Sequence, residues 1–230
     1  MNPLLAKTQR TQALDATNNE STRSADNAVL RNTYKLLGMT LLFSGAIALG
    51  SAALGLRSPG LMLTLAGYFG LLFLTTRLRN SHWGLVSVFA LTGFMGYTLG
   101  PILNAYLSMA NGGQIVSTAM VSTGVIFIGL SAFSLVTRKD FSFLANFLFV
   151  GILVAFLAGL GAIFFEMPML SLAVSSVFVL LMSGLILYQT SNLVNGGETN
   201  YIMATVTLYV SIFNLLTSML HLLGFMGSDE

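Results

Sequence analysis

The stretch Tyr188-Gln-Thr-Ser-Asn-Leu-Val-Asn-Gly-Gly-Glu-Thr-Asn-Tyr201 joins two long apolar runs near the end of the chain. In the second run, polar residues recur in alternate steps of four and three, so they fall on one face of a helix. This polar face consists of Asn200, Ala204, Thr207, Ser211, Asn214, Ser218 and His221. Polar side chains at membrane depth need partners, which come from neighbouring helices or enclosed water. The last helix is therefore predicted to lie at the centre of a helical bundle.

The composition is that of an integral membrane protein. Of the residues, 55% are hydrophobic and 8% charged, whereas about 25% are charged in ordinary soluble domains. Seven runs are long and apolar enough to cross a hydrocarbon core of about 30 Å. They cover residues 36–56, 61–76, 84–107, 115–137, 143–165, 170–190 and 201–225. The predicted fold is an all-α membrane protein, a seven-transmembrane-helix bundle with a central seventh helix.

Cations flank these runs asymmetrically, which predicts the orientation of the chain. One side holds Arg23, Arg31, Lys35, Arg77, Arg79, Arg138 and Lys139, and the other only Arg57. Because Lys and Arg resist translocation, the N-terminus is predicted to be cytoplasmic and the C-terminus, after an odd number of spans, external. The seven-helix domain is placed at residues 31–226, followed by a short external tail at 227–230.

Residues 1–30 differ in composition from the rest of the chain. They are rich in Thr, Asn, Ser, Gln and Ala, and their positive and negative charges balance. Such a segment buries too little apolar surface to offset its chain entropy, so a disordered cytoplasmic tail is predicted. No apolar core precedes Leu36, so the tail does not read as a signal peptide. It is either an inert leader or a flexible handle for a cytoplasmic machine.

Two sets of polar residues on the last two helices are candidate functional residues. The polar core of these helices comprises Gln189, Thr207, Ser211, Asn214 and Ser218. The inner-loop motif comprises Gly196, Gly197, Glu198, Thr199 and Asn200. In this loop the two glycines permit a chain reversal, either Thr199 or Asn200 caps the last helix, and Glu198 lies near the positive end of that helix. In the third run, Gly96 and Gly100 form a small-xxx-small pair that lets another helix approach closely.

Several classes of function are disfavoured by what the sequence lacks. It contains neither Gly-x-Ser-x-Gly nor His-Glu-x-x-His, and Ser218 with His221 has no accompanying oxyanion arrangement. The absence of cysteine excludes disulfides and thiolate metal sites. The dispersed cations give no nucleic-acid signal. No enzymatic activity, cofactor, metal or nucleic-acid partner is predicted, and the oligomeric state is left open.

Several short motifs together resemble the bacterial YccA branch of the Bax inhibitor-1 family, from about residue 29 to the C-terminus. These motifs are Arg31-Asn-Thr-Tyr34, Ser58-Pro-Gly60, Gly100-Pro-Ile-Leu-Asn104, Thr137-Arg-Lys-Asp140, Gly196-Gly-Glu-Thr-Asn-Tyr-Ile202 and Leu208-Tyr-Val-Ser211. The resemblance implies a last helix surrounded by the other six, in the bacterial inner membrane, with a periplasmic C-terminus. It also implies a protein that binds and slows FtsH, the membrane-anchored ATP-dependent protease, with regulators of FtsH and the lipid bilayer as further partners. The cytoplasmic tail is then the segment that the protease engages.

The same resemblance carries an alternative function, a proton or calcium leak channel. Members of the wider family conduct ions through a pair of aspartates on the last two helices, and the matching positions here are Gln189 and Ser211. Neither side chain ionises, which counts against a calcium leak. In this alternative the polar face lines a water-filled path, with Glu166, Glu198 or His221 at its mouths.

Overall fold

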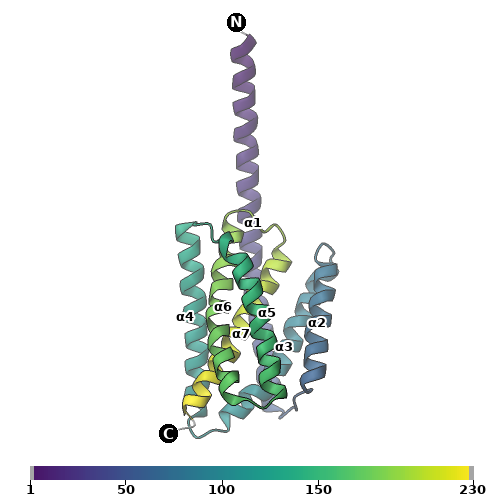
Figure 1. Cartoon of the computed structure of the whole chain (residues 1–230). Helices are drawn as coiled ribbons and strands as arrows, with labels where there is room; N and C mark the ends of the chain where they lie inside the picture. Colours follow the sequence, from purple (N-terminus) through teal and green to yellow (C-terminus); the bar gives the residue numbers. More distant parts are fainter. Residues whose placement is uncertain (1–2, 228–230) are drawn as a thin grey trace.

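Seven α-helices make up almost all of the described chain (Figure 1). The computed structural model describes residues 3–227, with side chains from residue 27 onward. The helices are α1 (Pro3–Ala53), α2 (Leu61–Leu78), α3 (Trp83–Leu107), α4 (Gly112–Thr137), α5 (Ala145–Phe164), α6 (Pro168–Val194) and α7 (Tyr201–Gly227), with a single 3₁₀ turn, η1 (Ser142–Leu144), before α5. All seven are long and apolar enough to cross a membrane, so the predicted number of spans is confirmed.

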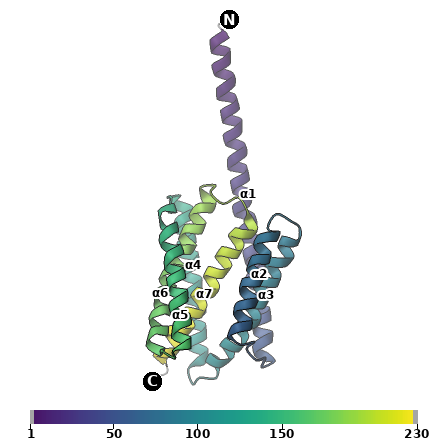
Figure 2. The same cartoon turned by 45° about the vertical axis from the view of Figure 1, so that its right-hand side comes forward.

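Helix α1 extends well beyond the other six helices at the N-terminal end of the bundle (Figures 1 and 2). It is helical from Pro3, where the sequence predicts a disordered tail over residues 1–30. This segment contains several Ala, Leu, Gln and Arg residues with high helix propensity, so the helix of the first span can propagate outward from the bundle. The side chains of residues 1–26 and the predicted external tail after Gly227 lie outside the described residues.

Helix α7 occupies the centre of the bundle, as predicted, and crosses it obliquely (Figure 2). From Tyr201 to Gly224 every one of its residues is buried or half-buried, and exposure begins only at Phe225. Its principal neighbours are α1, α3, α4 and α6, while α2 packs mainly on α3 and α5 mainly on α6. The central helix therefore has four close neighbours rather than the six that the resemblance implies.

Helix α7 also links the three apolar clusters that form the core. Leu208 belongs to a cluster shared with α1 and α3, Leu220 to one shared with α3 and α4, and Leu215 to one shared with α5 and α6. All three leucines are completely buried. Removing α7 would therefore expose every part of the core at once.

Helices α1 and α3 approach each other closely at two glycines. A Cβ atom on Gly96 would lie 2.8 Å from Ser44 Oγ and also against the Ser44 carbonyl oxygen, and one on Gly100 would lie 2.9 Å from the Ala48 carbonyl oxygen. Only glycine leaves room for the α1 backbone at these two positions. The predicted close approach of another helix to this glycine pair is thus confirmed, and α1 is that helix.

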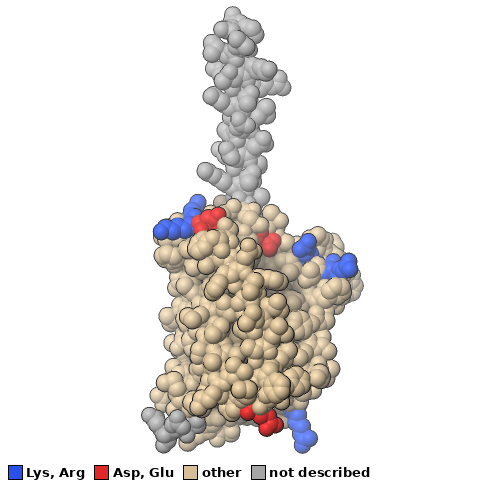
Figure 3. Space-filling view, in the orientation of Figure 1, with Lys and Arg blue, Asp and Glu red and all other residues tan. Residues whose placement is uncertain are grey.

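Charged side chains lie at the two ends of the bundle and leave an uncharged band between them on the face shown in Figure 3. Arg77, Arg79, Arg138 and Lys139 lie where α2 and α4 end, at the end from which α1 projects. Arg57 and Glu166 lie in the connections at the opposite end. Many large apolar side chains are exposed in between, including Phe149 at 70% and Leu180 at 73%, as expected for a surface that faces lipid.

Candidate functional site

The turn between α6 and α7 depends on its two glycines. Gly196 has a φ of 73°, in the left-handed region that glycine adopts at little cost. The Gly197 N–H donates to the Asn192 carbonyl oxygen at 2.8 Å, and a Cβ on Gly197 would collide with the Asn192 side chain. These contacts close the end of α6 and direct the chain into α7.

Asn200 is the N-cap of α7. Its Oδ1 accepts hydrogen bonds from the N–H groups of Ile202 and Met203, each at 3.1 Å. Glu198 Oε1 in turn accepts from the Asn200 N–H at 2.8 Å. Of the two capping residues that the sequence allows, the structure selects Asn200, while Thr199 is exposed.

Asn200 also joins α7 to the connection between α2 and α3. Its Nδ2 donates to Asn80 Oδ1 at 2.8 Å and to the Arg79 carbonyl oxygen at 3.2 Å. One amide group therefore caps the central helix with its oxygen and holds a distant loop with its nitrogen. The sequence did not single out Asn80, because nothing in its local pattern shows which loop lies beside residue 200.

The end of α6 holds the connection between α4 and η1 in the same way. Ser191 Oγ donates to the Lys139 carbonyl oxygen at 2.8 Å and accepts from the Phe141 N–H at 3.1 Å. Thr190 Oγ1 lies 3.3 Å from Tyr34 Oη of α1. Gln189, the preceding residue, is buried, and its Nε2 has no hydrogen-bond partner among the described residues. The structure thus assigns the cross-helix contacts to the two residues beside Gln189.

The predicted polar core of α7 is buried or half-buried and bonds largely to its own helix. Ser211 Oγ donates to the Thr207 carbonyl oxygen at 2.7 Å, and Asn214 Nδ2 donates to the Val210 carbonyl oxygen at 2.8 Å. Ser211 is fully buried, Ser218 is buried, and Thr207 is half-buried. Small polar side chains can donate to the carbonyl four residues earlier, which gives that donor a partner within the same helix.

Tyr209 forms cross-helix bonds in the middle of α7, where Ser211 and Asn214 bond their own helix. Its hydroxyl bonds to Ser44 Oγ of α1 and donates to the Thr92 carbonyl oxygen of α3 at 3.3 Å. Nearer the start of α7, Thr205 Oγ1 donates to the Thr33 carbonyl oxygen of α1 at 3.3 Å. Tyr209 falls outside the sequence-derived polar face, although a phenol hydroxyl deep in a span signals the need for a partner.

We expect Tyr209→Phe to lower the thermal stability of the purified protein more than Ser211→Ala does. The phenylalanine removes two bonds between helices, worth about 0.6 kcal/mol each on average, while Ser211→Ala removes a bond within one helix. The measurement is the midpoint of thermal unfolding in detergent for both variants. Equal midpoints would show that the Tyr209 hydroxyl does not connect the helices.

The three residues of the predicted ion path are not brought together. Glu166 lies exposed in the connection between α5 and α6, with a left-handed φ of 50°, and Glu198 lies at the opposite end of the bundle. His221 is half-buried, with Nδ1 2.7 Å from Ser175 Oγ of α6. Among the side chains described, no group of three or more His, Cys, Asp or Glu residues could hold a metal ion.

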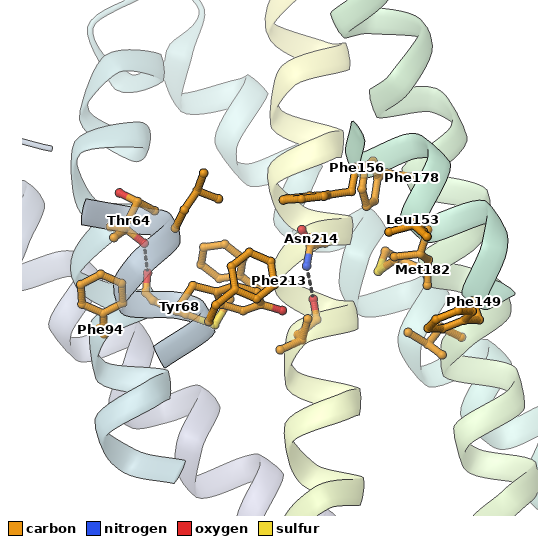
Figure 4. Close-up of a pocket in the computed structure, with 17 residues that line it drawn as sticks. Thr64, Tyr68, Phe94, Phe149, Leu153, Phe156, Phe178, Met182, Phe213 and Asn214 are labelled. Atoms are coloured by element: carbon orange, nitrogen blue, oxygen red, sulfur yellow. Dashed lines mark hydrogen bonds between the residues drawn. The ribbon is translucent and has the colours of Figure 1, made fainter. Parts of the chain in front are cut away.

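Asn214 also lines a cavity of about 450 Å³ between α2, α3, α5, α6 and α7 (Figure 4). The cavity walls are mostly aromatic and aliphatic, and the side chains of Tyr68, Phe94, Phe178 and Phe213 surround the space. Asn214 is the one carboxamide among the lining residues. The cavity was not expected from the sequence, since its walls come from five separate helices.

Comparison with known proteins identifies the class to which this fold and these motifs belong. Residues 26–228 match the family described as inhibitor of apoptosis-promoting Bax1, so the chain belongs to the Bax inhibitor-1 family, in its bacterial YccA branch. An Escherichia coli K12 protein named modulator of FtsH protease YccA is 52% identical over 201 residues, covering 87% of this chain and 91% of that protein. An uncharacterized Pseudomonas aeruginosa protein is 54% identical over 204 residues, 89% of this chain and 92% of the relative. An uncharacterized membrane protein of Vibrio cholerae is 46% identical over 206 residues, 89% and 92% of the two chains.

Proposed function

We propose that this protein binds the protease FtsH in the bacterial inner membrane and slows the degradation of other membrane proteins. The observation that carries this proposal is the 52% identity to the Escherichia coli protein named modulator of FtsH protease YccA. The match covers 87% of this chain and 91% of that protein. A protein from another Escherichia coli strain is also 52% identical to this chain, and it is named inner membrane protein YccA.

In the proposed orientation the N-terminus is cytoplasmic and the C-terminus periplasmic. The cations Arg77, Arg79, Arg138 and Lys139 at the N-terminal end of the bundle support this orientation, since positive loops remain in the cytoplasm. Residues 1–30 then lie on the side where an ATP-driven protease works. We propose that FtsH engages the protein through this segment, and that regulators of FtsH are further partners.

Slow extraction requires that a pull on residues 1–30 meets resistance in the bundle. These residues are continuous with α1, whose largest interface is with α3, at the Gly96 and Gly100 contacts. Helix α1 is also bonded to the central helix through Ser44 and Tyr209. Each interhelical hydrogen bond contributes only about 0.6 kcal/mol on average, so packing of α1 against α3 and α7 supplies most of the resistance.

The test is the half-life of an unrelated membrane substrate of FtsH in cells that overproduce this protein. The whole chain should lengthen that half-life, and deletion of residues 1–28 should restore it, because the protease has lost the segment that it engages. In a further variant, a Gly-Ser linker of equal length replaces residues 1–28. This variant shows whether the protease requires the sequence of the segment or only its length. All variants are compared at equal amounts in the membrane.

Two outcomes would count against the proposal at different levels. An unchanged substrate half-life with the whole chain would contradict modulation of the protease. A half-life that is lengthened equally by the whole chain and the deletion variant would support modulation but contradict engagement through residues 1–28.

A further inference from the structure

The cavity beside Asn214 is open on the side of the bundle that faces lipid. Its walls include Phe69 of α2 together with Phe149 and Leu153 of α5, and these three side chains are all exposed. Helix α2 packs mainly on α3 and α5 mainly on α6, and the cavity lies between these two outer helices and extends to α7. In Figure 4 the side chains from α2 and α5 flank this space and Asn214 lies on the central helix between them.

The chemistry of the walls selects a neutral, apolar occupant. No Lys, Arg, Asp or Glu lines the cavity, and the charged residues described for the bundle lie in or near the connections at its two ends. Seven of the lining residues are aromatic, namely Tyr68, Phe69, Phe94, Phe149, Phe156, Phe178 and Phe213. The Asn214 amide donates one hydrogen bond to the Val210 carbonyl oxygen, and its remaining N–H and its oxygen carry no net charge that could balance an ion. A headgroup or an ion would find no counter-charge in this cavity.

The shape of the opening selects a flexible chain rather than a helix. Phe69 of α2 and Phe156 of α5 meet edge to face with their ring centroids 5.7 Å apart, and this contact bridges the two outer helices. A transmembrane helix from a partner, about 10–12 Å across with its side chains, cannot occupy the space while this bridge is closed. A single hydrocarbon chain is much thinner than a helix.

The volume also fits a hydrocarbon chain. A cavity of about 150 Å³ in a protein core binds benzene, which has six carbon atoms. The present cavity, at about 450 Å³, is three times as large and so has room for about 18 carbon atoms. We propose that it binds the acyl chain of a membrane phospholipid, which enters from the bilayer between α2 and α5 and contacts the central helix at Phe213 and Asn214.

The proposal can be tested with tryptophan reporters and phospholipids that carry bromine at mid-chain, because bromine quenches the fluorescence of a nearby indole. The chain has a single tryptophan, Trp83, which Trp83→Phe removes to give a silent background. The reporter is Phe213→Trp, which faces the cavity. The matched control is Leu215→Trp, which is fully buried on the same helix and lies only about 3 Å further along the axis. Leu215 lines neither this cavity nor a second apolar groove near α1 and α4. Leu180→Trp, on the lipid-facing surface, sets the full quenching level.

Each variant is reconstituted into phosphatidylcholine vesicles with brominated or unbrominated chains. We expect the Phe213→Trp reporter to be quenched to more than half the level of Leu180→Trp, and Leu215→Trp to be quenched much less. Equal, weak quenching of the Phe213→Trp and Leu215→Trp reporters would overturn the proposal.

Phe213 also borders the second apolar groove near α1 and α4, whereas Val210 lines only the first cavity. Adding Val210→Phe to the Phe213→Trp reporter should therefore fill part of the first cavity and lower the quenching by at least half. Unchanged quenching would mean that the acyl chain lies outside the first cavity.

Variants enter the comparison only if they elute as a single species with a helical circular dichroism spectrum. If Phe213→Trp does not fold, Phe178→Trp on α6 faces the same cavity and Leu181→Trp is its buried control. The same pattern of quenching is expected for this second pair, and equal quenching of its two members would equally overturn the proposal. This experiment measures lipid contact and is independent of any effect on FtsH.

Discussion

Gly96→Leu should destabilise the bundle more than any other substitution considered for this protein. The added side chain would meet Ser44 Oγ and the Ser44 carbonyl oxygen of α1, and a backbone atom cannot move aside as a flexible side chain can. Overpacking of a well-packed core costs about 1–3 kcal/mol, and contact with backbone places this case at or above the upper end. For a chain of this length, about 3 kcal/mol corresponds to a fall of about 6–12 °C in the midpoint of thermal unfolding.

The control for this prediction is Gly50→Leu on α1, where a Cβ would have no atom within 4 Å and the residue is exposed. Both variants replace a glycine in a membrane-spanning helix by leucine, so they share any change in helix propensity or hydropathy. Gly50→Leu should leave the midpoint within about 2 °C of the wild type. If the two variants unfold at the same temperature, the close approach of α1 to Gly96 does not limit stability. In cells, the less stable Gly96→Leu variant should also be extracted and degraded faster.

Asn200→Ala should produce the second-largest loss of stability. It removes the N-cap of the central helix, worth about 1 kcal/mol, and two bonds to Asn80 and Arg79, worth about 0.5–1.5 kcal/mol each where they are well shielded from water. The expected total is about 2 kcal/mol, since the residue lies at the end of the bundle, where water partly replaces the lost partners. The unfolding midpoint in detergent should fall by about 4–8 °C.

Two neighbouring substitutions separate the functions of the Asn200 amide. Thr199→Ala should have almost no effect, because Thr199 is exposed and caps nothing among the described residues. Asn200→Asp keeps the oxygen that accepts from Ile202 and Met203 but lacks the nitrogen that donates to Asn80, so its midpoint should lie between those of the wild type and Asn200→Ala. An Asn200→Asp variant as unstable as Asn200→Ala would mean that the contact with the α2–α3 connection, rather than the cap, stabilises this end of α7.

Several features of this protein follow from the sequence alone because they depend on local composition. The length and hydropathy of the apolar runs predict seven spans, since any segment that crosses hydrocarbon must be about 20 residues long and satisfy its own backbone. Hydroxyl and amide groups along the last run predict its central position, because a lipid-facing helix would leave them without partners. Gly96 and Gly100 predict one close helix contact, because only small residues permit it.

The partners of these residues were decided only by the tertiary structure. Periodicity placed Ser211 and Asn214 on the polar face, but whether each bonds its own helix or a neighbour depends on rotamer and packing. Tyr209 bonds α1 and α3 because Ser44 and Thr92 face it across two helix interfaces. These two residues are 165 and 117 positions away from Tyr209 in the chain. The lipid-facing cavity exists because α2 packs mainly on α3 and α5 mainly on α6, which leaves a space between these two outer helices that reaches α7. A gap between helices has no signature in the sequence of any one of them, because it is set by how five separate helices are arranged.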